Sequence, residues 1–132
     1  MNNKGIVLFL VAALCLPLYG IAAGLLPETQ NGIQFLSGGI GMEERNAMRL
    51  EEKQYNLKLI FSLKGGAYLA DVRVSIDSGK KPLVEADSDG PLFYAKLAPG
   101  KYRITASYQG KTQTRAVTIG KHATNLYFRW AD

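Results

Sequence analysis

The stretch "EADSDG" places carboxylates at alternate positions, with Glu85, Asp87 and Asp89 preceding Gly90. A calcium-binding EF-hand loop begins with this spacing, and it needs a bidentate carboxylate at its twelfth position. Lys96 occupies that position and would put a positive charge where the cation needs its strongest ligand. We therefore expect no metal here. We interpret the stretch as the end of a strand followed by a tight hairpin turn, in which Asp89 caps the backbone and Gly90 has a positive φ.

Two other stretches partly match phosphate-binding loops. "SGGIG" at 37–41 precedes a predicted helix, but a dinucleotide fingerprint needs a glycine at the position of Glu44 and a surrounding βαβ unit. "GKT" at 110–112 lacks the glycine that a nucleotide loop has five residues earlier, because Thr105 stands there. We interpret both as turn sequences and expect no cofactor.

The chain supplies few groups for catalysis. Its one histidine is His122, and its one cysteine, Cys15, lies in the N-terminal apolar segment. A serine triad needs a nucleophile elbow, and no G-x-S-x-G is present; a zinc site needs several histidines or cysteines. The carboxylate pairs at 51–52 and at 87 and 89 fit a solvated surface. We expect no catalytic residue, although an enzyme of unknown reaction is kept as the least favoured hypothesis.

Tyrosines and basic residues recur on one predicted face. In the strand pattern, Tyr94, Tyr127 and also Tyr68 alternate to the side opposite the predicted core residues. Tyrosines beside basic groups on a sheet face can stack on sugars or hold a peptide, but tyrosine is also a common residue of half-buried strands. The candidate binding face consists of Tyr94, Lys96, Arg103, Tyr127 and Arg129.

The N-terminus has the layout of a secretory signal peptide over residues 1–23. Lys4 is followed by an apolar stretch from Gly5 to Leu18 and by small residues at Ala22 and Ala23, where we expect cleavage. A retained membrane anchor is the alternative. Loss of Lys4 lowers the modest net charge of +5, and no basic cluster indicates nucleic-acid binding. The sequence predicts a periplasmic or secreted protein without stable membrane insertion after cleavage.

The segment after the signal peptide divides into a linker and a helix. Residues 24–41 are rich in turn formers and are predicted to be a linker, within which "IQFL" fits a short strand. Residues 42–54 contain no Gly, Pro or β-branched residue and are predicted to be an α-helix, with acids in its first turn and a lysine in its last. Its thin apolar stripe would consist chiefly of Ala47 and Leu50, with Met42 or Met48 beside them.

Residues 55–132 alternate between apolar and polar side chains, with turn residues about every ten positions. The pattern predicts seven short strands in an all-β, antiparallel Ig-like sandwich, the N-terminal helix lying on its surface. The side chains predicted to point inward are Leu57, Leu59, Phe61, Leu63, Val72, Val74, Ile76, Phe93, Ala95, Leu97, Tyr102, Ile104, Ala106, Tyr108, Leu126, Phe128 and Trp130.

From Asn56 to Trp130 the chain resembles the carboxypeptidase regulatory-like domain, a seven-stranded prealbumin-like sandwich related in fold to transthyretin. The resemblance rests on "YLADVRVSID", on "DSDGPLFYAKLAPGKYRITASYQG" and on "TRAVTIG". It implies a fold and little about function, since such modules are accessory domains in very different proteins. The transthyretin-like hydrolases of urate breakdown use several histidines and a characteristic C-terminal tail. The single His122 and the ending "FRWAD" argue against that activity.

Three functional hypotheses follow. The first is a non-catalytic exported module that binds or stabilises an envelope protein, through an edge strand or through the aromatic sheet face. The second is a carbohydrate-binding module, which requires Tyr94 and Tyr127 to lie close together and exposed. The third is an enzyme, which requires polar groups that converge in a concave pocket.

Overall fold

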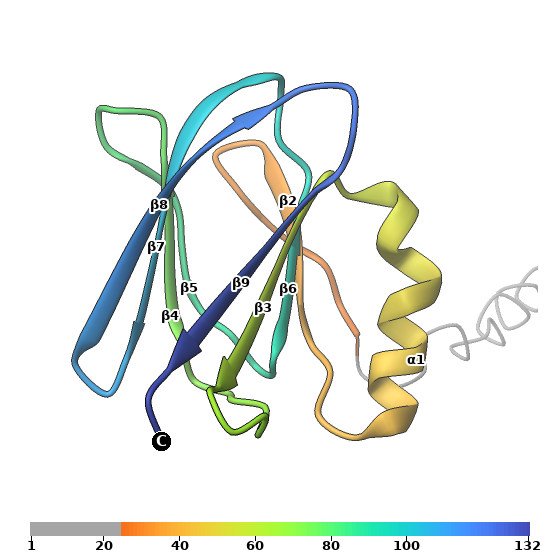
Figure 1. Ribbon diagram of the computed structural model, residues 1–132. Helices are drawn as coiled ribbons and strands as arrows, with labels where there is room; N and C mark the ends of the chain where they lie inside the picture. Colours follow the sequence, from red (N-terminus) through yellow and green to blue (C-terminus); the bar gives the residue numbers. More distant parts are fainter. Residues whose placement is uncertain (1–24) are drawn as a thin grey trace, which may run out of the picture.

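The computed structural model describes residues 25–132, so the predicted signal peptide lies outside the described residues. The chain folds into two facing β-sheets with one short helix, which confirms the predicted all-β sandwich at that level (Figure 1). In the order of their pairing, the strands of the five-stranded sheet are β1 (Glu28–Gln30), β2 (Ile33–Gly38), β6 (Leu92–Ala95), β3 (Leu57–Leu63) and β9 (Thr124–Trp130). Those of the four-stranded sheet are β5 (Pro82–Asp87), β4 (Arg73–Asp77), β7 (Gly100–Tyr108) and β8 (Lys111–Ile119).

Within residues 25–132, no helix is long and apolar enough to span a membrane.

The prediction of seven strands was wrong by two. All seven expected strands are present, but β1 and β2 also form, in the segment that was predicted to be a linker. β2 contains "IQFL", for which a short strand was expected, whereas β1 was not expected. They are joined by Asn31 and Gly32, whose φ values of 48° and 79° suit a two-residue hairpin loop. After that turn, Ile33 and Phe35 are buried on either side of the exposed Gln34, which is the alternation of a half-buried strand.

The expectation of a wholly antiparallel sandwich also needs correction. β3 and β9 pair in parallel over their full length, from Leu57 opposite Thr124 to Leu63 opposite Trp130. The other strand pairs are antiparallel.

The core fills the space between the two sheets. The predicted inward residues are buried there or packed against the buried cluster, so the alternation in the sequence correctly assigned both inner faces. An aromatic group closes one end, where the Phe61 ring lies 5.9 Å from Phe128 and 6.3 Å from Trp130 between ring centroids.

Helix α1 (Met42–Glu51), continued by the 3₁₀ turn η3 (Glu52–Gln54), confirms the predicted helix. It packs on the outer face of the five-stranded sheet, on the side away from β7 and β8 (Figure 1). The predicted apolar stripe was wrong, because Met48 is the fully buried side chain of the helix and Leu50 is 83% exposed. Met48 packs in a small cluster on that outer face, with Leu36, Tyr55 and Tyr94.

The "EADSDG" stretch does not form the predicted hairpin. It ends β5 in one sheet and leads to β6 in the other, so the chain crosses between the layers here. Asp87 lies 3.3 Å from the Arg73 guanidinium, and the Asp89 backbone N–H donates to Ser37 Oγ. Gly90 does not have the predicted positive φ. It is needed for a close approach instead, because a Cβ there would lie 2.6 Å from the carbonyl carbon of Gly38.

Gly90→Ala should therefore destabilise the protein. The backbone of Gly38 cannot move without disturbing β2, so we expect the free energy of unfolding to fall by about 1–3 kcal/mol. Gly120→Ala is the matched control, since nothing lies within 4 Å of a Cβ at that position. Urea denaturation would measure both; equal midpoints for the two variants would show that the crossing is not tightly packed.

Candidate functional site

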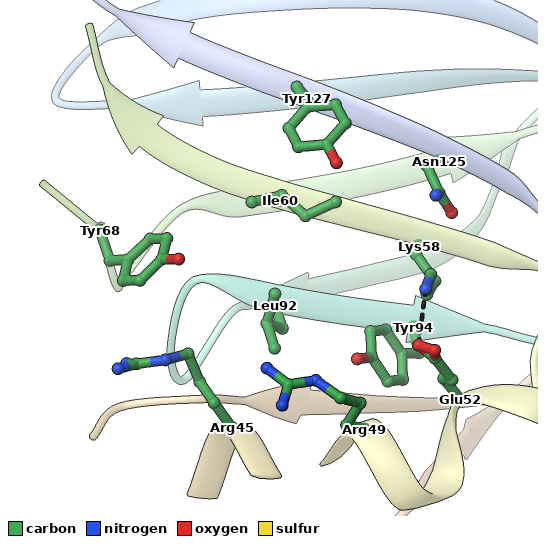
Figure 2. A pocket seen from close by; sticks show the side chains of 10 residues that line it. All are labelled: Arg45, Arg49, Glu52, Lys58, Ile60, Tyr68, Leu92, Tyr94, Asn125 and Tyr127. Carbon is green, nitrogen blue, oxygen red and sulfur yellow. Dashed lines mark hydrogen bonds and ion pairs between the residues drawn. The ribbon is translucent and has the colours of Figure 1, made fainter. Parts of the chain in front are cut away.

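The outer face of the five-stranded sheet is only half covered. Helix α1 lies over the β2 and β6 side of this face and leaves the side of β3 and β9 open (Figure 1). A cavity of about 230 Å³ lies on the outer surface between the helix and β9 (Figure 2). Ile60, Leu92 and Tyr94 contribute side chains from the sheet beneath it. We call this cavity, together with the open strip beside it, the α1–β9 groove.

Positive charge dominates the groove. Arg45 and Arg49 enter it from one side of the helix, because residues four apart share a helical face. Arg45 donates to the Gly39 carbonyl at 3.0 Å, and Arg49 donates to Asn46 Oδ1 at 3.0 Å. Both partners are neutral, so each guanidinium retains its charge and further donors for a ligand.

Lys58 of β3 carries the third positive charge, and Glu52 carries the one negative charge of the lining. Lys58 Nζ lies 2.8 Å from Glu52 Oε1, with both side chains partly buried, and 5.8 Å from the centre of the Tyr94 ring. This ion pair joins the end of the helical segment to the middle of the sheet. It therefore fixes one wall of the groove.

Three tyrosines surround the cavity, and Figure 2 shows their hydroxyl groups directed toward its centre. Tyr68, at 55% exposure, stacks under the Arg45 guanidinium at 4.9 Å, and Tyr127, at 48%, lies on β9. Tyr94 is only 4% exposed, because helix α1 covers it and the Tyr55 ring packs against it at 5.8 Å. Tyr94 thus offers its hydroxyl end to the groove and no open ring face.

The predicted binding face is only partly assembled. Tyr94 and Tyr127 do line the same cavity, and the Arg129 guanidinium lies 5.2 Å from the centre of the Tyr127 ring. Lys96 is exposed beyond the end of β6 and outside the cavity lining. Arg103 lies on β7, in the other sheet, where it pairs with Asp77 at 3.4 Å. Alternation within each strand was read correctly, but it cannot tell which of two sheets a strand joins.

Sequence reasoning missed the residues that give the groove its charge. Arg45, Arg49 and Lys58 were not among the predicted site residues. The spacing of the two arginines, on the same side of the helix as Met48, was the available signal. That signal is weak without knowledge of which side faces the sheet.

In "SGGIG", the backbone N–H groups that a phosphate would need are already hydrogen-bonded. The N–H groups of Gly39 and Ile40 both donate to Glu44 Oε1, at 2.6 Å and 3.1 Å. The carboxylate thus takes the place at the start of the helix that an anion would need. His122 is exposed in the loop before β9, and residues 25–132 contain no group of three or more His, Cys, Asp or Glu side chains placed to hold a metal ion.

The outer strands of the two sheets are joined by side chains rather than by backbone pairing. Along the first seam, between β1 and β5, Gln30 exchanges two hydrogen bonds with the backbone of Glu85, and Asn31 donates to the Leu83 carbonyl. Along the second seam, between β8 and β9, Gln113 and Arg115 donate to the carbonyls of Arg129 and Tyr127. In addition, Trp130 Nε1 donates to the Lys111 carbonyl. An added strand would have to displace these bonds, so the edges are poor templates for pairing.

Two tyrosine hydroxyls around the helix have perturbed acidity. Burial raises the pKa of Tyr94 above its ordinary value, Glu52 adds to the rise, and Arg49 opposes it. Burial also raises the pKa of Tyr55, with a further contribution from Glu51. Both phenols therefore stay protonated, and able to donate a hydrogen bond, beyond the range in which a solvated tyrosine ionises.

No protein-family model matches this sequence, and no curated protein sequence is similar to it. The structure defines the class of protein as a two-sheet β-sandwich that carries one helix on an outer face. Chemically, the α1–β9 groove offers guanidinium and phenol donors around a small apolar floor. Such a set of groups binds polar and anionic ligands.

The raised pKa values predict a loss of stability at alkaline pH. Above about pH 10 the unfolded chain ionises its tyrosines before the folded chain ionises Tyr94 and Tyr55, so stability falls as pH rises. Tyr94→Phe should make this decline shallower, because one of the two groups no longer titrates. Melting temperatures measured between neutral and strongly alkaline pH would show this decline. If the melting temperature of Tyr94→Phe fell with pH as steeply as that of the unchanged protein, the decline would not come from Tyr94.

The first seam can be tested separately. Gln30→Ala removes both bonds to Glu85, so we expect the free energy of unfolding to fall by about 1–2 kcal/mol. Exchange of the Glu85 amide proton should also become faster, because the amide faces the open edge once Gln30 is gone. Gln34→Ala, an exposed glutamine on the adjacent strand, is the control. Identical exchange in both variants would show that the seam does not protect the β5 edge.

Proposed function

We propose that this protein is a non-catalytic exported module that binds or stabilises a protein of the cell envelope through the α1–β9 groove. The observation that carries the proposal is the half-open outer sheet face, on which three cationic side chains and two exposed tyrosines surround one cavity. Arginine and tyrosine are the residue types that most often anchor protein interfaces. Export rests on the signal-peptide pattern of residues 1–23.

The seams favour the sheet face over an edge strand as the route to the partner. At both seams, side-chain hydrogen bonds already occupy backbone groups of the outer strands. A partner that added a strand would first have to break them. The open side of β3 and β9 presents side chains only, and a partner can contact these without disturbing the sandwich.

The size of the cavity also favours a protein partner. Pockets for small molecules usually have volumes of roughly 300–1,000 Å³ and enclose most of the ligand. This cavity, at about 230 Å³, is smaller and lies open on the sheet face. It suits one or two side chains of a larger partner.

We also propose a fold family, the carboxypeptidase regulatory-like domain with its prealbumin-like sandwich, for residues 55–132. The seven strands that the resemblance implies are all present, distributed over two facing sheets. Under this proposal, the β1–β2 hairpin and helix α1 are N-terminal additions. The hairpin pairs with β6 through β2, and the helix forms one wall of the groove.

A carbohydrate-binding module is the second candidate. Tyr68 and Tyr127 are exposed at the groove, which favours it. The hypothesis required Tyr94 and Tyr127 both to be exposed, and it fails in that form because Tyr94 is buried. The form that is kept relies on Tyr68 and Tyr127. An enzyme is the third hypothesis: the cavity does bring polar groups together, as this hypothesis required, but no observation identifies a reaction.

Site-specific photo-crosslinking tests the proposed function. A photoreactive phenylalanine analogue at Tyr127 should give a discrete protein adduct in intact cells, because the groove would be covered by the partner. The same analogue at Thr118, exposed on β8 of the opposite sheet, is the control and should give none. Adducts of equal yield at both positions, or at neither, would overturn the proposal. Absence of adducts together with specific sugar binding at the groove would support the second candidate.

A further inference from the structure

A second cavity lies next to the first, between η3, the start of β3 and the loop before β9. It has a volume of about 320 Å³, and it shares Glu52 and Lys58 with the first cavity. The Lys58–Glu52 ion pair therefore stands as a ridge between two adjacent hollows. Lys53 from η3 and Lys121 from the loop before β9 add their charges to the second hollow.

The two cavities together concentrate positive charge. Their linings contain one carboxylate, that of Glu52, and the cationic side chains of Arg45, Arg49, Lys53, Lys58 and Lys121. Glu52 is engaged by Lys58, and among the ion pairs of residues 25–132 none involves the other four cations. The other acids of the helix, Glu43, Glu44 and Glu51, lie outside both linings, and Glu44 is directed to the backbone of Gly39 and Ile40. The surface thus attracts an anionic partner.

We infer that the partner contributes an extended acidic segment, which crosses the Lys58–Glu52 ridge and places carboxylate side chains in both cavities. This inference rests on the proposed function and specifies the chemistry of the partner. Two separate hollows divided by a ridge suit successive side chains of a peptide better than one continuous sugar ring. The Arg49 guanidinium can bind a carboxylate through paired N–H donors, and the phenol hydroxyls can donate to it.

The shape of the floor explains why the segment binds through its side chains. The groove lies over the outer face of the sheet, where backbone groups are already paired within the ladders of β6, β3 and β9. Affinity must therefore come from charge and side-chain contact. It should decrease steeply as salt screens the interaction beyond a Debye length of about 8 Å.

Binding of a defined probe to the mature protein tests the inference. The probe is a short synthetic peptide rich in glutamate, with the equivalent glutamine peptide as its neutral control. In NMR chemical-shift mapping, the glutamate peptide should shift the amide signals of Arg45, Lys58 and Asn125. The glutamine peptide should leave them unchanged. Shift changes scattered over both sheets would overturn the inference, because they would indicate only general attraction to a basic protein.

Two double variants with the same change in net charge make the test specific. Arg49→Glu with Lys121→Glu changes one exposed residue from each cavity, whereas Lys80→Glu with Lys81→Glu changes the exposed loop between β4 and β5. We expect the groove variant to weaken binding of the glutamate peptide by about tenfold or more and the loop variant to have a much smaller effect. Arg49→Lys should weaken binding less than Arg49→Glu, because lysine keeps the positive charge and loses only the paired N–H donors. Equal losses in the two double variants would overturn the inference.

The outcomes separate this inference from the proposed function. If the crosslink at Tyr127 persists undiminished in the Arg49→Glu, Lys121→Glu variant, the module binds a protein but not through an acidic segment. Binding of polygalacturonate at the groove without binding of the glutamate peptide would also overturn the inference, and it would favour an acidic glycan. Loss of both the crosslink and peptide binding in the groove variant alone, with unchanged thermal stability, is the result expected.

Discussion

The groove depends on a very small apolar contact, the burial of Met48 against Tyr94 and Tyr55 on the outer face of the sheet. Met48 is the one fully buried side chain of α1, so the helix has no broad hydrophobic face to hold it in place. Two polar contacts complete its attachment. Glu44 binds the backbone before the helix, and Glu52 binds Lys58 after it. Because Met48 packs against Leu36 of β2 and Tyr94 of β6, the helix covers mainly that half of the sheet and leaves the groove beside it.

The hydrophobic pattern of the sequence predicted the strands well and the helix surface poorly, for one physical reason. In β3 and β7 the period of two separates core from solvent, and the burial of Leu59 and Ile104 followed directly. The inward side of α1 carries Arg45, Met48, Arg49 and Glu52, at the spacing of one helical face but with a single apolar member. The predicted stripe of Ala47 and Leu50 was wrong because the helix faces a polar groove as well as the sheet.

Contacts between sheets were the other limit of sequence reasoning. Nothing in the local pattern of "EADSDG" says that the chain changes layers between β5 and β6, and the hairpin interpretation of that stretch failed for that reason. The same uncertainty placed Arg103 on the wrong sheet. By contrast, Asn31-Gly32 is a local hairpin signal and was present in the sequence; giving it more weight would have revealed β1 as the partner of the strand expected at "IQFL".

The arrangement of charge has a cost in the free protein. Like charges on Arg45, Arg49 and Lys58 around one hollow repel one another, and a single carboxylate, Glu52, offsets part of that repulsion. The two seams show that this chain uses neutral amides freely to satisfy exposed backbone groups, as Gln30 and Gln113 do. Neutral polar side chains in the groove would have avoided the repulsion while leaving the Met48 cluster intact. Arg49 in particular makes only one hydrogen bond, to Asn46 of its own helix, so its charge is not required by the fold, and an anionic partner would make the concentration of charge here favourable.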